Sequence, residues 1–335
     1  MVSGMGRASA LWHNDRRYRH FPRMTRTLPV IQPDALRDFQ GRKPPWLKVR
    51  APGGPNYMRL QALMRERKLH TVCEEARCPN IGECWEERTA TFMILGDVCT
   101  RRCGFCAVSH GRPEWEDWGE ADRVGGTVAE MGLAHVVVTS VNRDDLADGG
   151  AEIFARTIAA IRREAPDCRV EVLIPDFQGV EAALDTVLRA RPDVLNHNIE
   201  TVPRLYRTVR PGSRYERSLE LFRRARAHPT APVTKSGMML GLGESADEVR
   251  ATMADLHAAG VQLLTVGQYL RPSPAHLPIV RYVPPAEFEA FASSGRALGF
   301  RHVEAGPLVR SSYHAKRQVE AAGAAISVGP AAAGA

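Results

Sequence analysis

The stretch "TFMILGDVCTRRCGFC", residues 91–106, combines a predicted strand with a cysteine motif. Its first part is a short apolar run with β-branched and aromatic side chains, a composition typical of strands. Directly afterwards, Cys99, Cys103 and Cys106 follow a C-x3-C-x2-C spacing. Structural metal sites usually have four protein ligands, whereas catalytic metal sites keep one position open for substrate. Three cysteines on the loop after a strand therefore indicate a metal centre with an open position.

Strand-like runs recur along the chain, and helical patterns separate them. The further runs are at residues 135–140, 169–175, 194–200, 235–241 and 262–268. Between them, apolar residues recur at helical spacing, and "SADE" at 245–248 is a capping-box signature. This alternation predicts an α/β fold with a parallel sheet and helices outside it. Six strand–helix units fit a partial (β/α)6 TIM-type barrel, and a doubly wound open sheet is the alternative.

Several polar residues lie near the ends of these predicted strands. They are Asn142, Asp145, Asn196, Asn198, Glu200, Lys235 and Gln268. In both candidate folds, the loops at the C-terminal ends of the strands carry the functional residues. Each residue taken alone is also a common strand-end cap or turn former. Together they predict the lining of one site.

Most of the net charge of +7 comes from the N-terminal segment. Residues 1–27 contain six arginines and one aspartate, which gives +5 and leaves +2 for all other residues. A basic face on the folded domain is therefore not indicated, which argues against nucleic-acid binding. No apolar run in the sequence is long enough for a membrane span. Seven cysteines without a secretory signal indicate a reducing compartment, and we expect a cytoplasmic protein.

The sequence predicts five segments. Residues 1–40 form a basic leader that we expect to be disordered, and 41–90 form an N-terminal extension with three cysteines. Residues 91–300 form the partial barrel, 301–318 a C-terminal segment, and 319–335 a flexible tail rich in alanine and glycine. An organelle transit peptide or an upstream extension before Met24 would also explain the leader.

A second cysteine set precedes the first strand. Cys73, Cys78 and Cys84 follow a C-x4-C-x5-C spacing. Zinc modules usually use paired C-x2-C units, and only Cys103 and Cys106 form such a pair. Iron–sulfur clusters instead take thiolates from closely spaced cysteines, and a [4Fe–4S] cluster held by three of them leaves one iron open. We therefore predict an iron–sulfur cluster at residues 99–106, and a zinc-stabilised nucleic-acid-binding module is the alternative.

The cysteine motifs and four further motifs carry a family resemblance. The C-x3-C-x2-C spacing with Phe105 before its last cysteine resembles the radical S-adenosylmethionine superfamily. Within it, the upstream C-x4-C-x5-C spacing resembles the lipoyl synthases. So do "TSVNRDDLADGGA" (139–151), "NHNIETVPRLY" (196–206), "KSGMMLGLGE" (235–244) and "RSSYHA" (310–315). The resemblance covers residues 40–318; another sulfur-inserting radical enzyme would need to share only Cys99, Cys103 and Cys106.

The resemblance implies two [4Fe–4S] clusters and S-adenosylmethionine as cofactors. It assigns the radical-generating cluster to Cys99, Cys103 and Cys106, and an auxiliary cluster to Cys73, Cys78, Cys84 and Ser312. Contacts to S-adenosylmethionine are expected from Asn142, Asp145, Asn198, Glu200 and Lys235. Arg310 is expected to orient the C-terminal segment or the acyl amide of the substrate.

The implied activity is that of a sulfurtransferase in lipoate biosynthesis. It inserts sulfur at C6 and C8 of a protein-bound N6-octanoyl-lysine to give the dihydrolipoyl group, with the auxiliary cluster as sulfur source. Side-chain acids and bases cannot remove the hydrogens of unactivated methylene groups, so a carbon radical is needed. The implied partners are octanoylated carrier domains, namely 2-oxoacid dehydrogenase E2 subunits and the glycine cleavage H protein. A low-potential electron donor such as flavodoxin or ferredoxin is also expected. Neither nucleic acid nor a membrane is expected as a partner.

Overall fold

Eight strands form one sheet in the part of the chain that the structure describes, and they follow one another in sequence order. The strands are β1 (His70–Thr71), β2 (Thr91–Ile94), β3 (His135–Ser140), β4 (Arg169–Leu173), β5 (Val194–Asn196), β6 (Val233–Leu240), β7 (Leu263–Gln268) and β8 (His302–Gly306). Only the pairing of β1 with β2 is antiparallel, whereas each later strand pairs in parallel with the next. The predicted α/β fold with a parallel sheet is confirmed, and β1 and β8 extend the six strands expected from the sequence.

The computed structural model describes residues 42–49, 51–86, 89–113, 117–321 and 323. The leader expected at residues 1–40 therefore lies outside the described residues. The helices are α1 (Pro55–Glu66), α2 (Val72–Glu75), α3 (Ile81–Glu86), α4 (Glu120–Met131), α5 (Ala151–Glu164), α6 (Glu181–Arg189), α7 (Tyr206–Val209), α8 (Tyr215–Ala227), α9 (Ala246–Ala258), α10 (Pro285–Leu298) and α11 (Ala315–Ala321). Short 3-10 turns occur at Pro45–Leu47, Phe177–Gly179 and Pro203–Leu205.

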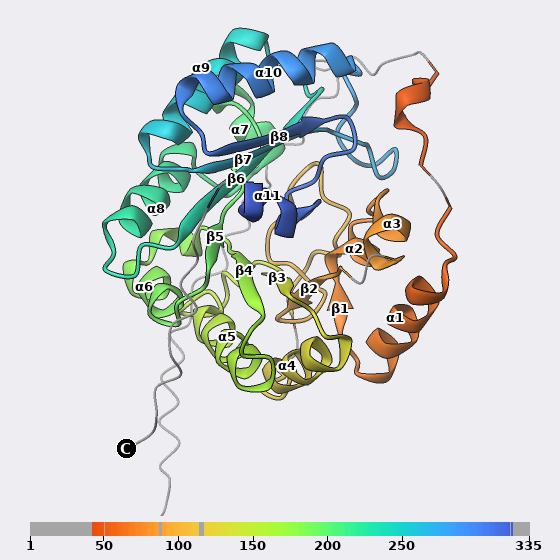
Figure 1. Cartoon of the computed structure of the whole chain (residues 1–335). Coiled ribbons are helices and arrows are strands. Elements are labelled where there is room, and N and C mark those ends of the chain that lie inside the picture. The colour runs from red at the N-terminus through yellow and green to blue at the C-terminus, as the bar shows by residue number, and fades with distance from the viewer. Residues whose placement is uncertain (1–41, 50, 87–88, 114–116, 322, 324–335) are drawn as a thin grey trace, which may run out of the picture. The chain divides into compact units, whose positions relative to one another are not determined.

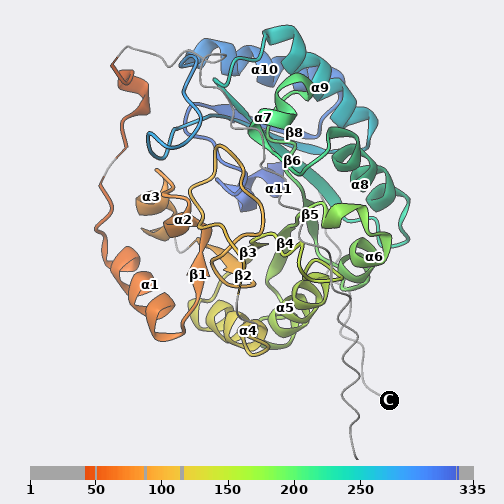
Figure 2. The same ribbon diagram turned by 180° about the vertical axis from the view of Figure 1, so that it is seen from behind.

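The helices between the parallel strands lie outside the curved sheet (Figures 1 and 2). Strands β3, β4 and β7 are buried along most of their length, as in sheets whose two faces are both covered. The α9 helix begins with the predicted capping box, because the Ser245 side chain and the Glu248 side chain bond each other's backbone N–H. No helix of the described residues has the length and apolar character needed to cross a membrane.

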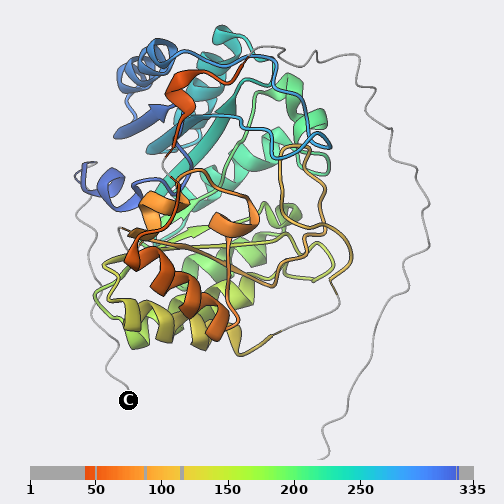
Figure 3. The ribbon, with the colours of Figure 1, turned by 90° about the vertical axis from the view of Figure 1, so that its right-hand side faces the viewer.

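The sheet is open between β1 and β8, since no pairing between these two strands occurs in the described residues. Helices α2 and α3 lie beside β1 on this open side (Figure 1). The α11 helix covers the opposite end of the barrel from the loops that follow the strands (Figure 3). There Val319 packs against Val194, Val233 and Leu263, each of which begins a strand.

This packing changes one predicted boundary. The tail was expected to begin at residue 319, but α11 continues to Ala321 and buries Val319 completely. An apolar side chain in the last helical turn is enough to hold that turn against the strands. Residues 322 and 324–335 of the expected tail lie outside the described residues.

Candidate active site

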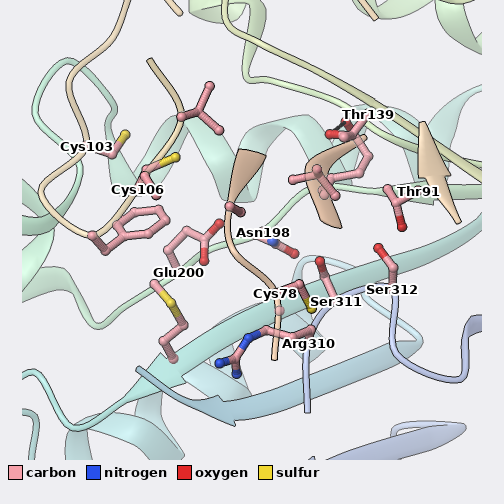
Figure 4. Close-up of a pocket in the computed structure, with 18 of the residues that line it drawn as sticks. Cys78, Thr91, Cys103, Cys106, Thr139, Asn198, Glu200, Arg310, Ser311 and Ser312 are labelled. Carbon is pink, nitrogen blue, oxygen red and sulfur yellow. Dashed lines mark hydrogen bonds between the residues drawn. The ribbon is translucent and has the colours of Figure 1, made fainter. Parts of the chain in front are cut away.

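Both cysteine sets line one cavity of about 530 Å³ inside the barrel. Figure 4 shows Cys103 and Cys106 on one side of this cavity, and Cys78 with Arg310, Ser311 and Ser312 on another. Asn198 and Glu200 lie between the two groups in this view. The lining reaches from the loops after the strands to Thr91, the first residue of β2. The cavity thus connects the two cysteine sets through the barrel interior.

The loop that carries Cys99, Cys103 and Cys106 leaves β2 through a tight turn. Leu95 and Gly96 have φ angles of 69° and 82°, so the chain turns sharply before the first cysteine. The loop then closes on itself, because the Cys99 N–H donates to the Ser109 carbonyl at 2.8 Å. Gly111 N–H donates back to the Cys99 carbonyl at 2.9 Å. All three cysteines of this closed loop line the cavity.

The Cys99 sulfur is surrounded by hydrogen-bond donors. The backbone N–H of Asn142 lies 3.3 Å from Cys99 Sγ, and the Asn142 side-chain amide lies 3.8 Å away. The Arg101 backbone N–H lies 3.4 Å from the same atom. These donors hold the Cys99 sulfur in place. The loop after β3 therefore fixes the position of this cysteine beside the cavity.

Arg101 fastens the cysteine loop to the loops after β3 and β4. Its guanidinium donates to Asp144 at 2.6 and 2.9 Å, to Asp176 at 2.5 Å and to the Ser213 hydroxyl at 3.0 Å. Burial alone would raise the pKa of Asp176, but the hydrogen bond and charge of Arg101 hold it well below its usual range. Sequence reasoning missed this residue, because an arginine between two cysteines gives no local sign of its partners.

The other side of the cysteine loop is held by the segment after β7. Leu277 N–H donates to the Gly104 carbonyl at 2.9 Å, and His276 Nε2 lies 3.0 Å from the Cys106 carbonyl. A β-carbon at residue 104 would come within 2.8 Å of the Leu277 side chain. Glycine is therefore needed here for the close approach of the two segments.

The second cysteine set is built on two short helices. Cys73 lies on α2, Cys84 on α3, and Cys78 in the turn between them. The turn is tight, since Arg77 has a φ of 51° and the Cys78 N–H donates to the Cys73 carbonyl at 2.9 Å. Cys84 N–H donates to the Asn80 carbonyl at 2.9 Å. These bonds bring all three cysteines to the cavity.

The C-terminal segment is tied to this second set across the open side of the barrel. The buried Asn80 side chain donates to the Leu308 carbonyl at 2.7 Å, and the Tyr313 hydroxyl donates to the Glu83 carboxylate at 3.1 Å. Ser312 lies between these two tie points and lines the cavity together with the cysteines. Tertiary contacts thus bring together residues that are more than 200 positions apart in the chain.

Comparisons with known proteins agree with this geometry. The model of the radical SAM superfamily matches residues 93–256, and that of the N-terminal domain of lipoyl synthase matches residues 35–78. The lipoyl synthase of Roseiflexus sp. is 58% identical over 89% of this chain and 99% of its own length. That of Rubrobacter xylanophilus is 60% identical over 85% of this chain and 89% of its own length.

The chain belongs to the lipoyl synthase family. Among solved structures, methylornithine synthase is similar with a TM-score of 0.45 and 16% sequence identity. The aligned region covers 57% of this chain and 56% of the methylornithine synthase chain. At that similarity the likeness adds nothing to the family assignment. Members of this family use S-adenosylmethionine and [4Fe–4S] clusters as cofactors. Their substrate is a lipoyl carrier protein, and they need a reductant.

The cysteines fit the clusters of a lipoyl synthase by their chemistry. Six of the seven cysteines line the cavity, and Cys168 is buried in the hydrophobic core. Burial raises the pKa of the Cys73 and Cys103 thiols to about 12 and that of Cys106 to about 11. Iron must therefore displace protons when it binds. No three His, Cys, Asp or Glu side chains of the described residues converge for a single metal ion. A four-iron cluster does not need that convergence, because each thiolate binds a different iron.

Three of the five predicted cofactor contacts lie on the cavity, namely Asn142, Asn198 and Glu200. The Oδ1 atoms of Asn142 and Asn198 are buried and have no hydrogen-bond partner among the described residues. Buried polar atoms normally have partners, so these two acceptors indicate a polar ligand. Burial raises the pKa of Glu200, an effect that the Arg210 guanidinium partly offsets. Arg210 also lines the cavity, and sequence reasoning missed it.

Lys235 and Asp145, the other two predicted contacts, do not line the cavity. Lys235 is fully buried, and its ammonium group donates to the Glu171 carboxylate at 3.0 Å instead of facing the cavity. It is the third residue of β6 and lies five positions before the C-terminal end of that strand. Asp145 forms an ion pair with Arg143 at 2.8 Å and is not part of the lining. An adjacent loop position does not ensure that a side chain points into the site.

Arg310 lines the cavity and is half-buried. It donates to the carbonyl of Gln268 at 3.1 Å and to that of Val309 at 2.8 Å. These bonds attach the C-terminal segment to the end of β7. The geometry agrees with the expected orienting role for the C-terminal segment, two residues before Ser312.

Proposed function

We propose that this protein inserts sulfur at C6 and C8 of an octanoyl group that is attached to a lysine of a carrier protein. The observation that carries the proposal is the single cavity that both cysteine sets and Ser312 line. An acyl chain in this cavity would lie between the two sets. Family membership supports the same reaction, because the lipoyl synthases of Roseiflexus and Rubrobacter are similar over most of this chain.

We assign the first step to residues at the C-terminal loops. The cofactors supply, when bound, a 5′-deoxyadenosyl radical on one side of the cavity and sulfide on the other. Cys99, Cys103 and Cys106 would hold three corners of the radical-generating cluster and leave the fourth for S-adenosylmethionine. The free Oδ1 atoms of Asn142 and Asn198 would accept hydrogen bonds from this cofactor. Glu200, which lines the same space, would face its polar groups.

The second set would hold the auxiliary cluster. Cys73, Cys78 and Cys84 would bind three corners, and the Ser312 hydroxyl would bind the fourth. A hydroxyl oxygen is a harder ligand than a thiolate and suits iron–sulfur chemistry less well. Ser312 would therefore be the ligand that leaves when sulfur is removed. Arg310 would hold the serine segment in place through its bonds to the Val309 and Gln268 carbonyls.

The carrier and the electron donor follow from this reaction. The carriers would be octanoylated domains of 2-oxoacid dehydrogenase E2 subunits and the glycine cleavage H protein. The electron donor would be a low-potential protein such as flavodoxin or ferredoxin. We place the protein in the cytoplasm, because oxygen-sensitive clusters require a reducing compartment.

A pair of serine variants tests the proposal. The reconstituted protein is incubated anaerobically with reductant, S-adenosylmethionine and an octanoyl-lysyl peptide. Wild type should form 5′-deoxyadenosine and a doubly thiolated peptide. Ser312→Ala should keep the formation of 5′-deoxyadenosine but lose most of the thiolated product. Ser311→Ala is the matched control, since Ser311 lines the same cavity but has no assigned iron, and it should retain the product.

Two results would contradict the proposal. If wild type forms 5′-deoxyadenosine but no sulfur enters the peptide, the proposed lipoyl synthase activity is contradicted. If the Ser311→Ala and Ser312→Ala variants lose the product equally, the specific role proposed for Ser312 is contradicted.

A further inference from the structure

The charged residues that line the cavity are almost all cationic. They are Lys43, Arg77, Arg101, Arg102, Arg210, Arg271 and Arg310, against the single carboxylate of Glu200, among the described residues. This is a local concentration, because residues 28–335 together carry a net charge of only +2. Arg101 and Arg210 are buried and Arg310 is half-buried, and all three belong to the cavity interior.

Three of these cations have no such interior role. Lys43, Arg77 and Arg102 are exposed to solvent although they line the cavity. A side chain with both properties lies where the cavity meets solvent. These three residues are called the rim cations below. None of them takes part in an ion pair within the described part of the chain. Their charges are therefore available to a partner.

The rim cations come from three separate segments. Lys43 precedes the 3-10 turn at Pro45–Leu47, Arg77 lies between α2 and α3, and Arg102 lies inside the C-x3-C-x2-C loop. Because the rim cations come from segments far apart in the sequence, their charge is not confined to one helix or loop. Together they surround the opening of the cavity. No acidic side chain with an exposed surface belongs to the lining in the described residues. The opening therefore has one sign of charge.

We propose that the rim cations form a docking edge for a protein surface rich in carboxylates, which belongs to the carrier domain that presents the octanoyl-lysine. This inference rests on the proposed function. The cavity admits an acyl-lysyl arm, but the folded carrier must remain outside and meet the rim. Clusters of one charge sign at an opening raise the rate of encounter with a partner of the opposite sign. The rim cations would therefore select an acidic carrier and steer it.

The test compares two triple charge reversals with the same change in net charge. The first changes the rim: Lys43→Glu, Arg77→Glu and Arg102→Glu. The control changes Arg59, Arg226 and Arg301 to Glu, which are exposed, have no ion pair within the described residues and lie off the cavity lining. Circular dichroism and iron content of the reconstituted proteins verify that each triple variant is folded and loaded.

Two substrates separate docking from chemistry. One is an octanoylated lipoyl domain of known negative net charge, and the other is a short uncharged octanoyl-lysyl peptide. The rim variant should raise the ratio of KM for the domain to KM for the peptide by about tenfold at low salt. The effect should shrink strongly at about 0.5 M salt, because screening shortens the range of the charges to a few ångström. The control variant should leave this ratio nearly unchanged.

A binding measurement keeps this inference separate from the catalytic proposal. Fluorescence anisotropy of the labelled octanoylated domain reports docking without turnover, and the rim variant should weaken binding by a similar factor. Equal binding by the rim and control variants would overturn the inference. So would a rise in KM for S-adenosylmethionine with no change for the domain. If wild type forms no thiolated product, the proposed function is contradicted. The binding measurement still tests the docking edge in that case, because it does not depend on turnover.

Discussion

Replacement of Arg101 by alanine should damage the cysteine loop more than any other single change outside the cysteines themselves. The Arg101 side chain is 4% exposed and bridges Asp144, Asp176 and Ser213. The Asp176 side chain is fully buried, with Arg217 at 3.1 Å as its second cation. Removal of Arg101 therefore leaves a buried carboxylate with half of its ion pairs.

The size of the effect follows from this burial. Breaking a buried ion pair by removing one partner costs about 3–5 kcal/mol, because an uncompensated charge stays inside the protein. Arg217 still faces Asp176, so we expect the lower end of that range, about 3 kcal/mol. The neighbouring Arg102 is exposed and forms no ion pair within the described residues, and Arg102→Ala should cost less than about 0.5 kcal/mol. Arg101→Lys should fall between the two, since lysine keeps the charge but not the forked geometry.

Urea unfolding of the cluster-free variants measures this difference without a contribution from iron. Reconstitution should then show a second effect: Arg101→Ala should bind less iron, because its cysteine loop is no longer fastened to the loops after β3 and β4. Formation of 5′-deoxyadenosine should fall in parallel with the iron that is lost. The reasoning is refuted if Arg101→Ala unfolds within about 0.5 kcal/mol of Arg102→Ala.

Two other predictions follow from buried polar contacts. Asn80→Ala should destabilise the protein by about 1–3 kcal/mol, because the Leu308 carbonyl loses its donor. It should also lower iron at the second cysteine set, measured as iron per chain, whereas the exposed Glu83→Gln change should not; unchanged iron in Asn80→Ala would contradict this. His197 donates from Nδ1 to the Ile174 carbonyl at 2.8 Å, and burial lowers its pKa to about 4. Since the folded state prefers the neutral ring, stability should be complete above about pH 6.5 and fall by about 3 kcal/mol as pH decreases towards 4. Urea midpoints measured across this range should show a smaller slope for His197→Gln, and an equal slope would exclude His197 as the cause.

Local sequence patterns predicted most of the barrel. The run at 135–140 became β3 with the same bounds, and four of the other five runs contain an observed strand. The run at 235–241 overlaps β6, which begins earlier, at Val233. The strands β1 and β8 were missed, because β1 has only two residues and β8 has a single large apolar side chain, Val303. The strand conformation of β8 depends on pairing with β7, a contact that no local pattern reveals.

The candidate site was predicted unevenly for a similar reason. Cysteine spacing is a local property, and all six cysteines of the two sets lie on one cavity. The partner of a charged side chain is a non-local property. Lys235 pairs with Glu171, which is 64 residues away, and Arg101 with Asp176, which is 75 residues away. The sequence therefore suggested cofactor contacts for Lys235 and Asp145 that the folded chain uses for ion pairs.

The sequence by itself determined the elements and the ligand types of this protein. Periodicity sets the strands and helices because it decides which face of each element avoids water, and cysteine spacing sets which sulfur atoms share one loop. Only the tertiary structure decided that the two cysteine sets face the same cavity and that Ser312 lies beside the second one. The physical reason is that these arrangements depend on contacts such as Asn80–Leu308 and Arg101–Asp176, which form only after distant segments have packed together. The exposed charge at the rim of the cavity likewise exists only in the folded chain, where three separate segments meet around one opening.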